Sequence, residues 1–169
     1  FSNSLGYGLL NFGAGWLTEG PVSPQMFLRS VPYVLSVGAV FVNTTIPDIP
    51  GDQSSGERTT GVFLGARRSL VLSTLLLSLA LTSSLFLRDW ICLTASAWSL
   101  PLFVRAAVKA DLKSCFQSMR IGAPSMVILT GLLFPPFIIL VVLVFFSMRV
   151  YYKRRFGVIY PTVGEAGRS

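Results

Sequence analysis

Residues 69–87 of this chain read SLVLSTLLLSLALTSSLFL, a stretch without a charged side chain. It can cross a bilayer as one α-helix, because a span needs about 20 mainly apolar residues. Thr74, Ser78 and Thr82 follow one another at four-residue spacing, which predicts a polar stripe facing another helix. The whole chain of 169 residues is similar in character, with 52% hydrophobic and 12% charged residues and a mean hydropathy of +0.66. We therefore predict an integral membrane protein.

The charge-free runs predict five membrane spans joined as an all-α, multi-pass transmembrane helical bundle. The fourth run is the shortest, and it reaches a spanning length because Arg105 and Lys109 can extend their charged groups toward the membrane surface. Pro135 and Pro136 lie within the fifth and predict either a kink there or a split of the span into a re-entrant pair. The five predicted spans cover residues 1–18, 26–46, 69–87, 90–110 and 121–149.

The residue inventory excludes several classes of function. The chain has no histidine, which excludes Ser-His-Asp catalysis, HExxH zinc sites and histidine-ligated haem. Its two cysteines, Cys92 and Cys115, form no pattern that predicts a disulfide framework or a thiolate metal site. The net charge of +7 comes from basic residues in short segments between apolar runs, so the expected partner is the lipid bilayer and no nucleic acid.

Basic residues also indicate the orientation in the membrane. Seven of them gather on the side that carries residues 47–68, and the positive-inside rule places that side in the cytoplasm. A second basic cluster, Arg149 with residues 153–155, falls on the opposite side if there are five spans. It argues either against this orientation or against a single crossing by residues 121–148. The seven residues on the first side are Arg58, Arg67, Arg68, Arg105, Lys109, Lys113 and Arg120.

The longest polar segment between spans is a predicted loop, residues 47–68, which reads PDIPGDQSSGERTTGVFLGARR. Asp48 and Asp52 in this segment are four residues apart, which brings both carboxylates onto one face if the backbone there is helical. Two convergent carboxylates suit Mg²⁺, because proteins hold this cation with one or two carboxylates plus waters and phosphate oxygens. The pattern is therefore compatible with a magnesium and phosphate site.

Other charged residues of the same segment can extend that site. Glu57 can add a carboxylate, and Arg58, Arg67 and Arg68 lie close enough in sequence to meet the charge of a phosphate group. The alternative is a solvated turn rich in Pro, Asp, Ser and Gly between two membrane spans. The residues alone leave both interpretations open.

The acidic segment resembles the second aspartate-rich motif of the UbiA superfamily of intramembrane prenyltransferases, through Asp48-x-x-x-Asp52 followed by Gly56-x-Arg58-Thr59-Thr60. The layout is similar too, because two predicted spans before the motif and three after it match the C-terminal five of the family's usual nine. The resemblance implies that residues 1–169 are the C-terminal part of one transmembrane prenyltransferase domain. The family's first aspartate-rich motif is missing from them, and Phe1 begins inside an apolar run, so we expect a piece of a longer protein that is inactive alone.

The resemblance implies a transferase that moves a polyprenyl group from its diphosphate to an electron-rich acceptor within the membrane. The acceptor would be apolar or aromatic, such as a quinone or lipid precursor. Asp48 and Asp52 would be catalytic carboxylates that bind Mg²⁺, and Arg58, Thr59 and Arg67 would bind the polyprenyl diphosphate. The alternative is a transporter, or a non-catalytic membrane subunit, whose acidic loop binds a cation.

Overall fold

The computed structural model describes residues 4–158, and every regular element in that range is a helix. Among these elements, α3, α5, α6 and α8 are long and apolar enough to cross a membrane, which confirms the predicted all-α, multi-pass membrane bundle. The chain forms two compact units, Phe1–Met126 and Val127–Ser169. In chain order the elements are the π-helix η1 (Leu5–Leu10) and the α-helices α2 (Asn11–Trp16), α3 (Pro24–Thr44), α4 (Ile49–Ser55), α5 (Thr60–Leu87), α6 (Trp90–Lys109), α7 (Leu112–Leu133) and α8 (Pro135–Phe156).

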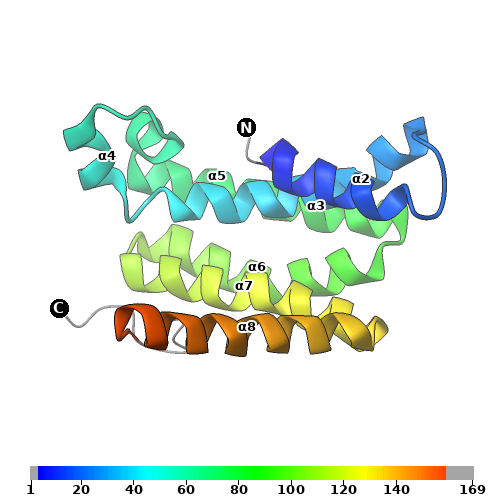
Figure 1. The fold of residues 1–169 in the computed structure, drawn as a ribbon. Coiled ribbons are helices and arrows are strands. Elements are labelled where there is room, and N and C mark those ends of the chain that lie inside the picture. Colours follow the sequence, from blue (N-terminus) through cyan, green and yellow to red (C-terminus); the bar gives the residue numbers. More distant parts are fainter. Residues whose placement is uncertain (1–3, 159–169) are drawn as a thin grey trace. The chain divides into compact units, whose positions relative to one another are not determined.

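The first unit is built around α5, which packs along both α3 and α6, while α4 lies at one end of α3 and α5 (Figure 1). Small side chains in these contacts let the helices approach closely, as membrane bundles require in the absence of a hydrophobic driving force between helices. One core cluster contains Ala39, Leu77 and Phe103, and a second contains Ile46, Leu70, Ala106 and Cys115.

Helix boundaries in this unit follow signals in the local sequence. α3 begins after Ser23, whose hydroxyl accepts a hydrogen bond from the Met26 N–H at 3.4 Å, and Pro24 occupies its first position. α5 and α6 are joined by Arg88 and Asp89 alone, and the Asp89 carboxylate accepts a hydrogen bond from the Cys92 N–H at 3.0 Å. A connection this short makes α5 and α6 an antiparallel hairpin.

Residues 47–68, predicted as a loop, are largely helical, because they contain α4 and the first turns of α5. The prediction took proline and glycine as loop signals, but Pro50 lies in the first turn of α4, where its missing N–H is not needed. Gly56 then ends α4 in the left-handed conformation, with φ 76°. Gly65, with φ 74° and ψ 164°, interrupts α5 with a kink. The acidic segment, residues 47–68, therefore consists mainly of the short helix α4 and the first turns of α5.

The predicted single span over residues 121–149 is wrong, because the structure has α7 and α8 there with Phe134 between them. Pro135 and Pro136 occupy the first turn of α8, so they separate two helices instead of kinking one. The physical reason is that each proline lacks an N–H and clashes with the carbonyl four residues earlier, whereas the first turn of a new helix accepts both. The placement of Arg149 and residues 153–155 on the membrane side opposite residues 47–68 assumed five spans. It therefore no longer follows, because this region contains two helices.

The predicted span over residues 1–18 begins in residues 1–3, which lie outside the described part of the chain. Its described part is η1 and α2, neither of which is among the helices long enough to cross a membrane. Both lie against α3: the rings of Tyr7 and Phe41 are 5.4 Å apart, and those of Phe12 and Tyr33 are 5.1 Å apart. At Gly8 an added Cβ would lie 2.6 Å from the backbone of α3, so glycine is what permits this contact.

The first half of α7 enters the same unit from a capped turn. The Asp111 carboxylate accepts a hydrogen bond from the Ser114 N–H at 2.6 Å, and this bond holds the pKa of Asp111 below its usual value. Further along, Ser118 accepts a hydrogen bond from the side chain of Asn43 at 3.0 Å, and Gly122 lies against α6. One face of α7 therefore packs against the unit, with Ser114, Cys115 and Ser118 buried, while Lys113, Phe116 and Arg120 stay exposed.

Gly61 provides a test of the packing between α5 and the turn that follows α3. An added Cβ at Gly61 would lie 2.6 Å from the Thr45 carbonyl oxygen, so the backbone must move to accept a side chain. We expect Gly61→Ala to lower the free energy of unfolding by about 1–3 kcal/mol. Thermal or denaturant unfolding in detergent micelles measures this change.

The matched control is Gly51→Ala, because an added Cβ at Gly51 in α4 meets no atom within 4 Å. Here we expect no loss of stability, or a gain of up to about 1 kcal/mol, since alanine favours the helix. Equal destabilisation by the two substitutions would contradict the close contact at Gly61.

Candidate functional site

The two predicted carboxylates lie one helical turn apart. Asp48 is the residue before α4, and its carbonyl oxygen accepts a hydrogen bond from the Asp52 N–H at 2.8 Å. Asp48 is exposed and Asp52 is half-buried. A four-residue separation in helical backbone puts both side chains on the same face of the helix. The two aspartates therefore share one side of a new short helix, which is not an extension of α3.

Thr59 fixes one member of this pair. Its hydroxyl donates a hydrogen bond to Oδ2 of Asp52 at 2.8 Å and accepts one from the Val62 N–H at 3.4 Å. The second bond caps the start of α5. Thr59 therefore holds the Asp52 carboxylate against the beginning of α5. Its predicted contact with a substrate stays a prediction, and the sequence analysis missed this positioning contact.

The remaining charged residues of the segment, Glu57, Arg58, Arg67 and Arg68, are exposed. Over residues 4–158 no group of three or more Asp, Glu or Cys side chains is arranged to hold a metal ion, so Glu57 does not complete a set with the two aspartates. Arg58 directly precedes Thr59 in the chain, whereas Arg67 lies on α5 beyond the kink at Gly65. The structure thus joins Asp52 and Thr59 by a side-chain hydrogen bond, with Asp48 one helical turn away, and it exposes Arg58, Arg67 and Arg68 to solvent.

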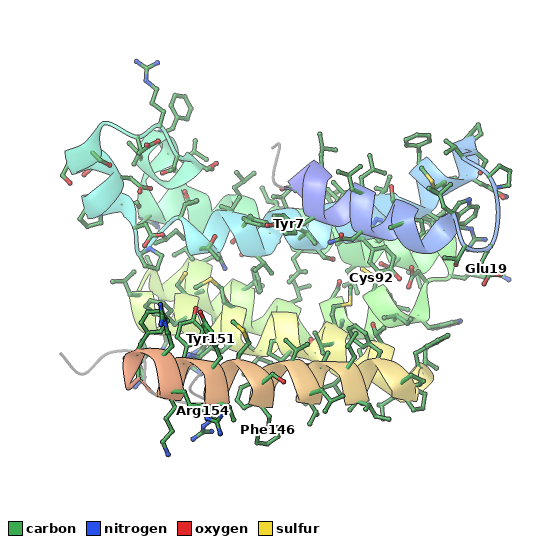
Figure 2. The ribbon with its side chains drawn as sticks, in the orientation of Figure 1. Tyr7, Glu19, Cys92, Phe146, Tyr151 and Arg154 are labelled. Atoms are coloured by element: carbon green, nitrogen blue, oxygen red, sulfur yellow. The ribbon has the colours of Figure 1, made fainter. Side chains whose placement is uncertain are left out.

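A cavity of about 260 Å³ lies inside the first unit, between α3, α5, α6 and α7. The hydroxyl groups in its wall are engaged within the protein: Ser36 Oγ lies 3.3 Å from the Sγ of Cys92 (labelled in Figure 2), and Ser99 donates to the Ala95 carbonyl oxygen at 2.8 Å. A wall whose polar groups already have partners suits an apolar ligand. The apolar part of the wall comes from Val37, Val40, Phe41, Leu77, Ala95, Phe103, Gly122 and Met126.

The cavity and the carboxylates follow one another along the chain. Phe41 lines the cavity near the end of α3 and precedes Asp48 by seven residues in the chain. Asn43 lies between them, and its Oδ1 atom is buried without a hydrogen-bond partner among the described residues. The hydroxyl oxygen of Ser69 on α5 is also buried without a hydrogen-bond partner among the described residues. The two unsatisfied polar atoms and the acidic pair thus all lie on α3, on α5 or on the segment that connects them, and both helices also line the pocket.

The resemblance implies an apolar groove for a prenyl tail, but the residues that line this pocket were not predicted, because four helices form it together. Comparison with known proteins gives no family assignment: the chain matches no protein-family model, no curated protein and no solved structure. The functional argument therefore depends on the residues and geometry of the site itself.

Replacing Thr59 tests its positioning role. We expect Thr59→Val to remove both hydrogen bonds of the hydroxyl and to destabilise the first turn of α5 by about 1 kcal/mol, which is roughly a fivefold change in an equilibrium constant. Hydrogen–deuterium exchange of a peptide that covers Val62 and Phe63 should then become faster by a similar factor. Thr59→Ser keeps the hydroxyl and should exchange like the wild type. Unchanged exchange in Thr59→Val would show that the hydroxyl does not hold this turn.

Proposed function

We propose that this chain supplies part of the active site of a membrane-embedded, Mg²⁺-dependent prenyltransferase. The observation that carries the proposal is the helical pair Asp48 and Asp52, with Asp52 fixed by Thr59, at the end of a bundle that contains a partly open apolar pocket. The donor set fits the cation, because Mg²⁺ prefers oxygen ligands and needs only one or two carboxylates when waters and phosphate complete the shell. Thr59 uses Oδ2 of Asp52, which leaves Oδ1 for a cation.

The proposed substrate is an amphiphile with a diphosphate head and an isoprenoid tail. The apolar pocket suits the tail, and the acidic pair with its cation suits the head. The exposed guanidinium groups of Arg58 and Arg67 are the predicted contacts for the remaining negative charge. A substrate bound in this way places its reactive carbon where the head meets the tail.

In the proposed reaction the bond between C1 of the prenyl group and the diphosphate oxygen breaks, and the electron pair leaves with the diphosphate. An electron pair of the acceptor forms the new bond to C1, and the acceptor then loses a proton. Bound Mg²⁺ supplies charge neutralisation for the leaving group. Asp48 and Asp52 hold the cation in place, while Arg58 offers a positive charge beside Thr59. The resemblance assigns the other aspartates of such a site to a first motif that residues 1–169 lack.

We also propose that the α4 end of the first unit faces the cytoplasm. The basic residues of this unit support that orientation, because Arg29 and Arg88 alone belong to the opposite end of its helices. Glu19 also lies at that opposite end, away from α4 (Figures 1 and 2). The basic residues at the α4 end are Arg58, Arg67, Arg68, Arg105, Lys109, Lys113 and Arg120.

Magnesium-dependent binding tests the proposed site. We expect the purified chain in detergent to bind a short prenyl diphosphate more tightly with Mg²⁺ than with EDTA. Asp48→Asn and Asp52→Asn should each weaken the Mg²⁺-dependent binding about tenfold or more, because each removes one of two carboxylates from the cation. Isothermal titration calorimetry or equilibrium dialysis measures the Kd.

Glu19→Gln is the matched control, because it removes one exposed carboxylate at the other end of the unit. It should leave the Kd unchanged. Binding that is indifferent to Mg²⁺ and to both aspartates would return α4 to a solvated connection and favour a transporter or a non-catalytic subunit.

Sided thiol labelling tests the orientation. The two natural cysteines, Cys92 and Cys115, are buried, so they should react slowly with a membrane-impermeant maleimide. We expect Ser54→Cys, at an exposed position of α4, to be labelled from the cytoplasmic side of membrane vesicles, and Glu19→Cys from the opposite side. Labelling of Ser54→Cys from the outer side would reverse the proposed orientation.

A further inference from the structure

α8 in the second unit carries its charges at one end only. The helix is long and apolar enough to cross a membrane, and none of its residues is buried. It contains no acidic residue, and its basic residues all lie in the last two turns, at Arg149, Lys153, Arg154 and Arg155. This end of α8 therefore presents four positive charges without a counter-charge on the same helix.

One face of α8 connects those charges to an apolar stripe. A shallow groove on the helix is lined by Leu143, Phe146 and Val150 and continues to Tyr151, Arg154 and Arg155. These positions recur at intervals of three and four residues, so they share one side of the helix. Phe146, Tyr151 and Arg154 are labelled on α8 in Figure 2. We call this the basic-aromatic face of α8; within three helical turns it changes from apolar to cationic.

Aromatic rings mark the depth at which the cations lie. Tyr151 and Tyr152 pack edge to face with ring centroids 5.6 Å apart, and Phe156 lies 6.2 Å from Tyr151 and 5.6 Å from Tyr152. Tyrosine side chains at the end of a membrane helix gather at the level of the lipid headgroups. The basic turn of α8 is thus expected at headgroup depth, with the apolar stripe beside the acyl chains.

We propose that the basic-aromatic face of α8 binds anionic phospholipid. The phosphate group lies against the guanidinium groups of Arg154 and Arg155, which can donate two parallel hydrogen bonds each, and an acyl chain lies along Leu143, Phe146 and Val150. Clusters of four or more basic residues next to a membrane helix attract anionic lipid by about 1 kcal/mol per residue.

Other occupants fit this face less well. A soluble polyanion matches the charge but leaves the apolar stripe uncovered, and a second copy of α8 in parallel brings four positive charges against four. Basic residues in the last turn of a helix also stabilise it through its dipole, whatever lipid is present. A preference for anionic over neutral lipid would therefore not arise from this stabilising role and tests the proposed binding.

The test compares lipid binding by the purified chain in a neutral detergent, measured by native mass spectrometry with added phosphatidylglycerol or phosphatidylcholine. We expect the wild type to prefer phosphatidylglycerol and to lose this preference at high salt. Arg154→Gln with Arg155→Gln should weaken phosphatidylglycerol binding about tenfold or more. The matched control, Arg29→Gln with Lys113→Gln, removes two exposed cations elsewhere and should bind like the wild type. Circular dichroism confirms that each variant keeps its helix content.

Several outcomes would overturn the proposal. Equal binding of the two lipids, or an equal loss in both double variants, would show that this face does not select anionic lipid. Displacement of phosphatidylglycerol by an oligonucleotide or by inorganic phosphate at similar concentration would assign the cations to a soluble anion. Self-association that disappears in Arg154→Gln with Arg155→Gln would assign the face to a second copy of the chain. None of these outcomes depends on the proposed prenyltransferase activity.

Discussion

A bilayer offers no hydrogen-bond partner to a peptide group, and this constraint governs most of the structure. The chain meets it with helices that satisfy their own backbones and with short capped connections such as Arg88–Asp89. Buried hydroxyl groups meet it as well: Ser73, Ser84 and Ser99 each donate to a carbonyl oxygen three or four residues earlier on their own helix. These serines add little volume, so the helices can pack closely without leaving polar atoms unpaired.

The same constraint decides where charged chemistry can occur. A carboxylate is costly within the hydrocarbon, so the acidic pair lies past the end of α3, on a helix of only two turns. There Asp48 can be exposed, while Asp52 needs an internal partner because it is half-buried, and Thr59 supplies it. The apolar pocket lies within the bundle, and the acidic pair lies past the end of α3. A ligand that uses both must be amphiphilic, which connects the geometry of the site to the proposed substrate.

The sequence predicted the spans well where hydropathy alone determines them. α3 and α6 differ from the predicted spans by two residues or fewer at each end, and α5 ends at Leu87 as expected. Predictions failed where tertiary context competes with a local signal: Pro50 begins a helix, and Pro135 separates two. In the predicted polar stripe on α5, the Thr74 hydroxyl lies 2.8 Å from the Leu70 carbonyl oxygen of its own helix and 3.2 Å from the Phe103 carbonyl oxygen of α6. Ser78 and Thr82 donate to carbonyl oxygens of α5 itself. The cavity and the Thr59 contact depend on packing that periodicity does not encode.

α5 links the two halves of the candidate site through its break at Gly65. Beyond the break, Leu77 lines the cavity, so this part of α5 must follow the bundle. Before it, Gly61 lies against the Thr45 carbonyl oxygen and Thr59 holds Asp52, so this part must follow the turn and α4. A straight helix cannot meet both requirements, and φ of 74° at the break is a conformation that glycine adopts without the strain of about 1–2 kcal/mol that other residues incur. The break at Gly65 therefore lets α5 pack within the bundle beyond the break and hold Asp52 through Thr59 before it.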